Sequence, residues 1–173
     1  MYKDKLVGPV FIDRCLQIFA VFNRFKAGYG NKRLDFYTKR EMNQYDFFPK
    51  PLPDAYITIK NKGEDDSRYF LEIYDVLSPF FTHRRTLNKH MEYYDSGEWE
   101  EEVGGDYPNL LLICETPQLE RRIQKLAERL QASTGAYMTI YTTSTKVLLA
   151  ARSPEKEIWT DIDELEELVA LSP

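Results

Sequence analysis

The sequence predicts an α/β fold in which a mixed β-sheet is flanked by helices, and three observations support this prediction. Hydrophobic residues make up 43% and aromatic residues 14% of the 173 residues, which is enough for a packed core of ordinary size. Segments with the period of a helix alternate with segments of strand type. No repeat and no linker divides the chain. We therefore expect a single domain over residues 1–173.

Apolar residues recur at helical spacing in several segments. The predicted helices are residues 7–26, a segment from about Thr82 or Thr86 to Gly97, residues 117–131, a short helix within residues 144–154 and a final helix after Thr160. The clearest is 117–131, because Thr116 can cap it and Pro117 suits its first position. Residues 144–154 could instead form the second arm of a hairpin, although a short helix capped by Ser144 is favoured.

Strand-type segments are short, apolar or alternating, and bounded by turn residues. The predicted strands are residues 33–42, 54–60, 68–77, 107–116 and 135–144, with an acidic connection before the fourth. Short connections join the first three, which predicts an antiparallel meander. Later strands return through helices, which favours parallel placement by right-handed crossovers.

Composition restricts the class of partner and site. The formal net charge of −5 argues against a generally basic surface for nucleic acid but permits a local basic strip. Cys15 and Cys114 have no metal-ligand spacing, so two buried free thiols are expected rather than a zinc site or a disulfide. No apolar run reaches about 18 residues and no signal peptide is recognised, so we expect a cytoplasmic protein without a membrane partner.

Two carboxylates stand in neighbouring strand segments. Asp54 begins one strand and Glu72 lies inside the next, and the 61–67 turn would make them neighbours if the strands pair. A magnesium-dependent nuclease needs oxygen ligands that converge on one ion, which activates water and stabilises the phosphate. Asp54 and Glu72 are therefore candidate Mg²⁺ ligands and catalytic residues. The alternatives are that Asp54 only hydrogen-bonds a nearby N–H and that Glu72 faces solvent.

This arrangement resembles the PD-(D/E)XK nuclease-like superfamily. Pro53-Asp54 and Glu72 match the two acidic parts of the motif, whereas Tyr74 stands where a lysine would be expected. The order helix, three-strand meander, helix, strand is also similar to the core of that superfamily. The resemblance implies a restriction-endonuclease-like core.

A longer resemblance is to the bacterial replication-relaxation family, whose members are implicated in plasmid replication or mobilisation. It covers roughly residues 34–160 and rests on the stretches PLPDAYITI, YFLEIYDV, TLNKHMEYY, YPNLLLICETPQLERRIQKL and EIW. The positions carried over by this resemblance are Glu72, Lys89, Tyr93 and Arg121 or Arg122.

The chain departs from that family in two respects. Family members commonly carry a winged-helix DNA-binding segment upstream, for which this chain has no room. The acidic residue that often stands two places after Glu72 is replaced by Tyr74. These departures put autonomous DNA recognition and full catalytic competence in question.

Cations on the predicted helix that ends at Gly97 suggest phosphate contact. Lys89 is a third candidate catalytic residue, because a lysine on the following helix can reach back to the same ion. Arg84, Arg85 and Lys89 form a strip that could hold backbone phosphates, against the alternative of a solvated face. The basic residues of helix 117–131 alternate with Glu120 and Glu128 and are expected to be salt-linked.

The sequence therefore leads to one favoured function and two alternatives. In the favoured function, the chain is an accessory protein of plasmid replication or mobilisation that contacts DNA or a replication or transfer partner. Its catalytic site is degenerate or only weakly active. The alternatives are an active Mg²⁺-dependent DNA nuclease and a non-enzymatic protein–protein interaction module.

Overall fold

The computed structural model describes residues 8–63 and 65–171 of this chain. It confirms an α/β fold with a seven-stranded mixed sheet and helices on both faces. The helices are α1 (Pro9–Tyr29), α2 (Lys39–Met42), α3 (Phe80–Ser96), α4 (Glu98–Glu102), α5 (Pro117–Thr134) and α6 (Thr145–Ala150). The strands are β1 (Leu34–Thr38), β2 (Ala55–Ile59), β3 (Ser67–Tyr74), β4 (Asn109–Cys114), β5 (Ile140–Ser144), β6 (Trp159–Asp161) and β7 (Leu168–Val169).

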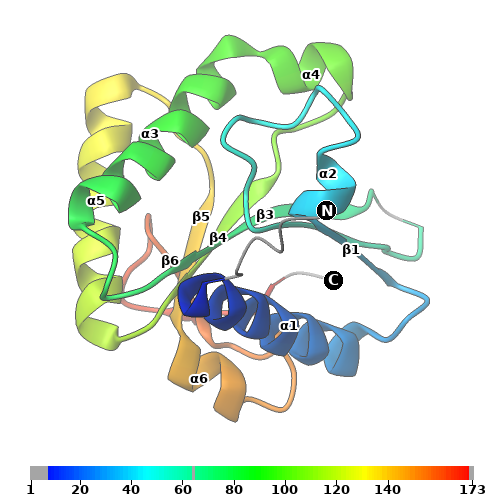
Figure 1. Cartoon of the computed structure of the whole chain (residues 1–173). Coiled ribbons are helices and arrows are strands. Elements are labelled where there is room, and N and C mark those ends of the chain that lie inside the picture. Colours follow the sequence, from blue (N-terminus) through cyan, green and yellow to red (C-terminus); the bar gives the residue numbers. More distant parts are fainter. Residues whose placement is uncertain (1–7, 64, 172–173) are drawn as a thin grey trace, which may run out of the picture.

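The strands follow one another across the sheet in sequence order (Figure 1). β1, β2 and β3 form the predicted antiparallel meander. β4 and β5 then join in parallel, each after a helix, as the predicted crossovers require. β6 and β7 complete the sheet in antiparallel orientation. The α/β class with a mixed sheet is therefore confirmed, as are the antiparallel meander of β1–β3 and the parallel placement of β3, β4 and β5.

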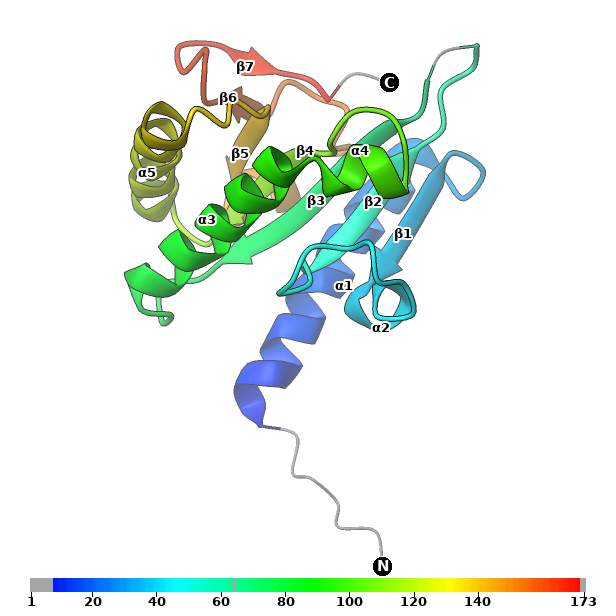
Figure 2. The same cartoon turned by 90° about the horizontal axis from the view of Figure 1, so that it is seen from above.

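Strand alternation divides the interior into two cores. Along β3, Phe70 and Tyr74 face a core shared with α3 and α5, whereas Leu71 and Ile73 face a core shared with α1 and α6. Figure 2 shows α3 and α5 side by side over one face and α1 beneath the other. Both faces of β3 and β4 are covered, which explains their nearly continuous apolar sequences.

Local capping shortens the first predicted strand. β1 ends at Thr38 because the Glu41 carboxylate accepts hydrogen bonds from the Thr38 backbone N–H at 2.7 Å and hydroxyl at 2.9 Å. This capping box begins the short helix α2 at Lys39, within the region predicted as strand. The correction matters for the site, because α2 brings Lys39 to the start of β2.

The predicted C-terminal helix is wrong. Trp159 is fully buried, and its Nε1 donates to the Pro154 carbonyl at 2.9 Å, so β6 is held beside β5. Of the apolar residues that suggested a helix, Ile162 is buried, whereas Leu165 and Leu168 are exposed. Strand pairing with the sheet therefore outweighs a helical pattern that has no surface to pack against.

Two smaller expectations are also corrected. The acidic connection before β4 contains the helix α4, which is held by the buried Trp99 and its hydrogen bond to the Asp106 carbonyl. Cys15 is exposed on α1, and only Cys114 is buried as expected. No helix in the described ranges combines the length and the apolar character that crossing a membrane requires.

Gly28 permits a close approach between α1 and the loop after α6. A Cβ at this position would lie 2.3 Å from Ser153 Oγ and 2.8 Å from the Pro154 ring. Alanine favours helices over glycine by about 1 kcal/mol, but overpacking costs about 1–3 kcal/mol. We therefore expect Gly28→Ala to lower the urea midpoint, whereas Asn23→Ala at an exposed site of the same helix should raise it slightly. A higher midpoint for Gly28→Ala would contradict this.

Candidate functional site

The hairpin places the two predicted carboxylates next to each other in the pairing. Ala55 of β2 lies opposite Leu71 of β3, and the Asp54 N–H donates to the Leu71 carbonyl at 2.9 Å. Asp54 precedes Ala55 and Glu72 follows Leu71, so the two carboxylate residues stand side by side at the end of this antiparallel pairing. The predicted pairing through the 61–67 turn is confirmed.

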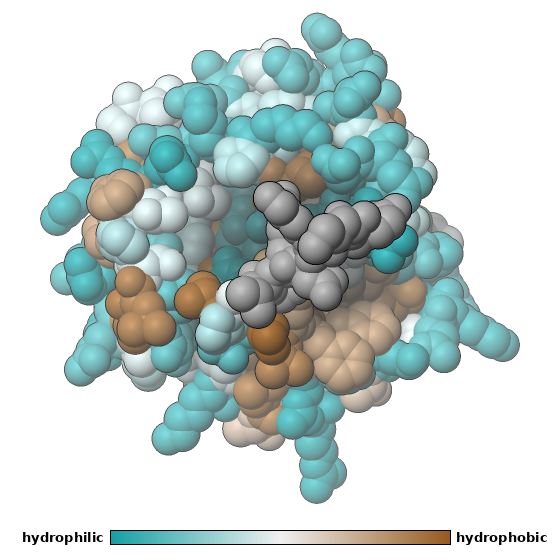
Figure 3. All heavy atoms as spheres, viewed as in Figure 1, coloured by the Kyte–Doolittle hydropathy of each residue, from teal (hydrophilic) through white to brown (hydrophobic). Residues whose placement is uncertain are grey.

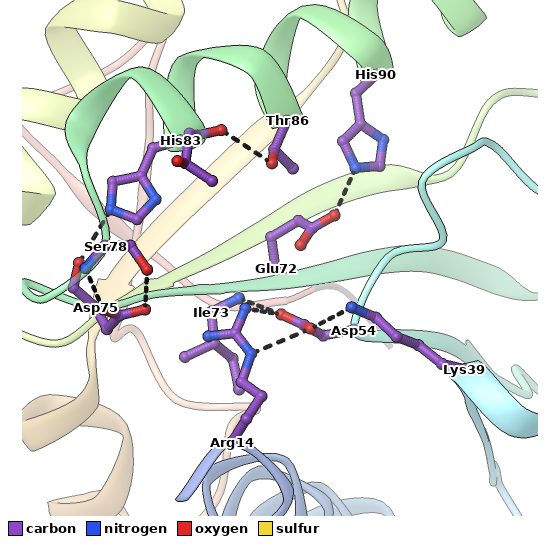
Figure 4. Close-up of polar contacts among 11 residues, drawn as sticks. Arg14, Lys39, Asp54, Glu72, Ile73, Asp75, Ser78, His83, Thr86 and His90 are labelled. Carbon is purple, nitrogen blue, oxygen red and sulfur yellow. Dashed lines mark hydrogen bonds and ion pairs between the residues drawn. The ribbon is translucent and has the colours of Figure 1, made fainter. Parts of the chain in front are cut away.

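Asp54 is fully buried and bound by cations of its own chain (Figure 4). Its Oδ1 accepts from Arg14 Nε at 3.2 Å and lies 3.0 Å from Lys39 Nζ. Its Oδ2 accepts from Arg14 Nη2 at 2.5 Å and from the Ile73 backbone N–H at 2.9 Å. Four donors thus occupy the roughly four lone-pair positions that a carboxylate offers. The bidentate contact with Arg14 is the geometry that makes such pairs strong.

Glu72 has a separate set of partners on α3. Its Oε1 lies 3.0 Å from His90 Nε2, and His90 Nδ1 lies 3.0 Å from the hydroxyl of Tyr107. The side chains of Glu72 and His90 are 6% and 3% exposed. Burial raises the pKa of Glu72, while the hydrogen bond from His90 opposes that rise.

The two carboxylates therefore turn to different helices, Asp54 to α1 and α2 and Glu72 to α3 (Figure 4). A magnesium ion needs free carboxylate oxygens and near-octahedral geometry. The acceptor positions of Asp54 are occupied by cations and an N–H. Within the described ranges, no three or more His, Cys, Asp or Glu side chains are grouped as metal ligands. The arrangement present does not fit a bound magnesium ion.

The lysine that reaches the carboxylate of Asp54 is Lys39 of α2 and not the predicted Lys89 of α3. Lys89 is exposed on α3, where its Nζ pairs with Glu92 at 2.5 Å, whereas Lys39 of α2 reaches Asp54. Arg14 could have been noticed in the sequence, because it interrupts the apolar face of the first helix. Lys39 carries no such signal, since its position depends on α2, which was not predicted.

Tyr74, at the position where the resemblance expects a lysine, points into the interior. Its ring packs against His83 at a centroid distance of 4.6 Å. Its hydroxyl is buried without a hydrogen-bond partner in the described part of the chain, and burial raises its pKa well above the ordinary tyrosine value. Tyr74 therefore supplies neither a cation nor a hydrogen bond to Glu72.

The outer surfaces of α3 and α5 carry cations that have no ion-pair partner in the described ranges. They are Arg84 and Arg85 of α3 and Arg121, Arg122, Lys125 and Arg129 of α5, all exposed. The expected salt links within α5 are absent from the described ranges, and Glu120 accepts a hydrogen bond from Thr142 at 3.1 Å. Arg122 also stacks on Phe80 at 4.2 Å, which ties the two helices together.

The surface between α3 and α1 is hollowed, with hydrophilic residues in its depth (Figure 3).

Comparison of the chain with protein-family models, with curated proteins and with solved structures found no match.

Proposed function

We propose that this chain is a nuclease-like domain of plasmid replication or mobilisation that contacts DNA without cleaving it. In this proposal the carboxylate pair stabilises the fold, and the outer face of α3 and α5 binds backbone phosphates. The unpaired cations on that face are the observation that carries the proposal.

The order of elements supports the nuclease-like part of the proposal. α1, the meander β1–β3, α3 and the parallel strand β4 follow the order that the resemblance implies. Asp54 and Glu72 also occupy the adjacent strand positions at which that superfamily carries its acidic residues. A shared order does not fix an activity, so the chemistry must come from the site itself.

Side-chain contacts support the non-catalytic part. A nuclease must expose carboxylate oxygens to an ion and a substrate, but Asp54 is enclosed by Arg14, Lys39 and the Ile73 N–H. Lys89, the candidate for orienting water, is held by Glu92 on the outer surface of α3. These contacts favour structural ion pairs over a metal site.

The phosphate-binding part rests on matching positions in two parallel elements. α3 and α5 follow the parallel strands β3 and β4, so both helices begin at the same edge of the sheet. Arg84 and Arg85 are the fifth and sixth residues of α3, and Arg121 and Arg122 hold the same places in α5. Four arginines therefore stand at equivalent positions near the starts of two helices that begin at the same edge of the sheet, an arrangement that suits a backbone with regularly spaced phosphates.

Acidic residues limit the extent of this face. The acidic helix α4 follows the C-terminal end of α3, and Glu92 and Asp95 precede it. DNA would therefore contact the N-terminal halves of α3 and α5. This separation explains how a chain with a net charge of −5 can still bind an anionic polymer.

The test replaces four of these cations while leaving Arg122 to stack on Phe80. Fluorescence anisotropy with labelled duplex DNA, measured over a salt series, compares the wild type with Arg84→Gln, Arg85→Gln, Arg121→Gln and Lys125→Gln combined. We expect weaker binding and a shallower salt dependence, by about 0.9 in log–log slope for each lost phosphate contact.

The matched control removes the same charge elsewhere, by Lys32→Gln, Lys62→Gln, Lys146→Gln and Lys156→Gln, all at exposed positions. It should retain most of the affinity. Equal losses in both variants, or wild-type protein that binds no DNA, would contradict the proposal.

Incubation of supercoiled plasmid with Mg²⁺ or Mn²⁺ separates this proposal from the nuclease alternative. We expect no nicking by the wild type and no rise in its thermal midpoint on adding either ion. Nicking that is lost in Glu72→Gln would establish catalysis and overturn the non-catalytic assignment.

A further inference from the structure

The N-terminal half of α1 extends beyond the body of the protein (Figure 2). Its apolar side chains are unusually exposed: Val10 79%, Phe11 63%, Ile12 48%, Leu16 59% and Phe19 59%. Hydrophobic residues gather over this helix on the face shown in Figure 3. Single exposed apolar residues are common on soluble proteins, but a contiguous group of this kind marks a binding surface.

Apolar grooves flank this exposed ridge on both sides. One, of about 570 Å³, lies between α1 and the β1–α2 region and includes Phe22 and Phe36 in its lining. The other, of about 230 Å³, lies between α1 and α6 and is lined by Ala20, Val21 and Leu148 among others. The same helix therefore supplies both a projecting ridge and the walls of the grooves beside it.

We propose that the N-terminal half of α1 is the interface of a two-fold symmetric dimer. In such an interface, the same patch on each chain contacts its copy, so it must be self-complementary. The ridge of one α1 would enter a groove beside the α1 of the second copy, and the second ridge would do the same in return.

Charge favours a second copy over a charged partner. The stretch PVFIDRCLQIFA at the start of α1 contains Asp13 and Arg14 as its only charged residues, and Arg14 is engaged with Asp54. Within the described residues, this stretch of α1 therefore lacks the cluster of lysines and arginines that anchors amphipathic helices on anionic membranes. Its two charged side chains are of opposite sign, so they do not select an oppositely charged protein.

The exposed area is of the right order for a dimer. A buried phenylalanine contributes about 150–250 Å², so Phe11 and Phe19 at their observed exposures supply roughly 200–300 Å². The three aliphatic residues bring the ridge to roughly 500 Å², against about 800 Å² per partner in a typical stable interface. The groove walls beside the ridge can provide the remainder.

Cys15 offers a probe within this surface. It is exposed and lines the larger groove, whereas Cys114 is buried, and burial raises the pKa of its thiol. Dimer formation should slow the reaction of Cys15 with a maleimide as the protein concentration rises. The reaction of a monomer would not depend on protein concentration.

The test combines sedimentation equilibrium with maleimide labelling on the wild-type chain and on Phe11→Glu with Leu16→Glu. We expect a wild-type dimer whose dissociation constant rises at least about tenfold in the double variant, together with faster labelling of Cys15. The control places the same charges at exposed apolar sites elsewhere, as Leu77→Glu with Tyr137→Glu, and should remain dimeric.

Three outcomes would overturn the proposal. The first is a wild-type chain that stays monomeric up to about 100 µM, well above the micromolar range of specific association. The second is a dimer that the α1 variant does not weaken. The third is a monomer that floats with neutral phosphatidylcholine vesicles through α1. The last would assign the surface to lipid. A circular dichroism spectrum of the double variant must keep the helical signal of the wild type, so that a loss of dimer reports the interface and not unfolding.

Discussion

Asp54→Ala is expected to lower the free energy of unfolding by about 3–5 kcal/mol, because removing one partner of a buried ion pair leaves the other charge uncompensated. Arg14 is 28% exposed at its side chain and would lose both of its bonds to the carboxylate. The Ile73 N–H would lose its acceptor as well. Urea denaturation at pH 7 measures the loss directly.

Two further variants separate these contributions. Asp54→Asn keeps an acceptor for the Ile73 N–H and should lose less than Asp54→Ala, and adding Arg14→Leu should recover part of the remaining loss. Asp35→Asn is the matched control, since Asp35 pairs with Lys60 at a largely exposed site, where such pairs contribute about 0–1 kcal/mol. An Asp54→Ala protein as stable as the wild type would mean that the carboxylate serves something other than the fold.

His90→Leu should produce a comparable loss, about 3–5 kcal/mol at pH 7, because it leaves Glu72 buried without its partner. This loss should depend on pH. Burial raises the pKa of Glu72 above its ordinary value of 4.5, so the native state holds the proton of this carboxyl more tightly than the unfolded state does. The stability that protonation contributes is present below pH 4.5 and is lost as the pH rises through the native pKa.

The variant should therefore gain stability as the pH is lowered from 7 toward 4.5, because a protonated Glu72 needs no basic partner. Each unit by which the native pKa exceeds 4.5 corresponds to about 1.4 kcal/mol over that range. Adding Glu72→Gln to His90→Leu should remove this pH dependence and restore part of the stability at pH 7. A loss that stays constant between pH 7 and 4.5 would show that His90 contributes packing alone.

Both predictions test whether the two carboxylates stabilise the fold, as the proposed function requires. A carboxylate held open for a metal ion usually costs stability, whereas Asp54 and Glu72 are each enclosed by partners that the chain itself provides. If both predictions hold, the acidic pair acts as a structural link between the sheet and helices α1, α2 and α3. DNA contact then depends on the outer face of α3 and α5, which the two variants leave intact.

The sequence by itself determined the alternation of the main helices and strands from α1 to β5, the hairpin that pairs Asp54 with Glu72, and the caps at Thr116 and Gly97. These features are encoded within a few neighbouring residues, by side-chain period, by turn chemistry and by capping. They are therefore visible without knowledge of the fold.

Only the tertiary structure decided what surrounds each carboxylate. Arg14 is 40 residues from Asp54 in the sequence, and His90 is 18 residues from Glu72, so their meeting depends on how α1 and α3 pack on the sheet. The same holds for the segment after Thr160, whose local pattern predicts a helix. In the structure it completes β6, which pairs with β5, and forms β7, which pairs with β6. Contacts between distant segments are set by packing of the whole chain, and no local pattern reports them.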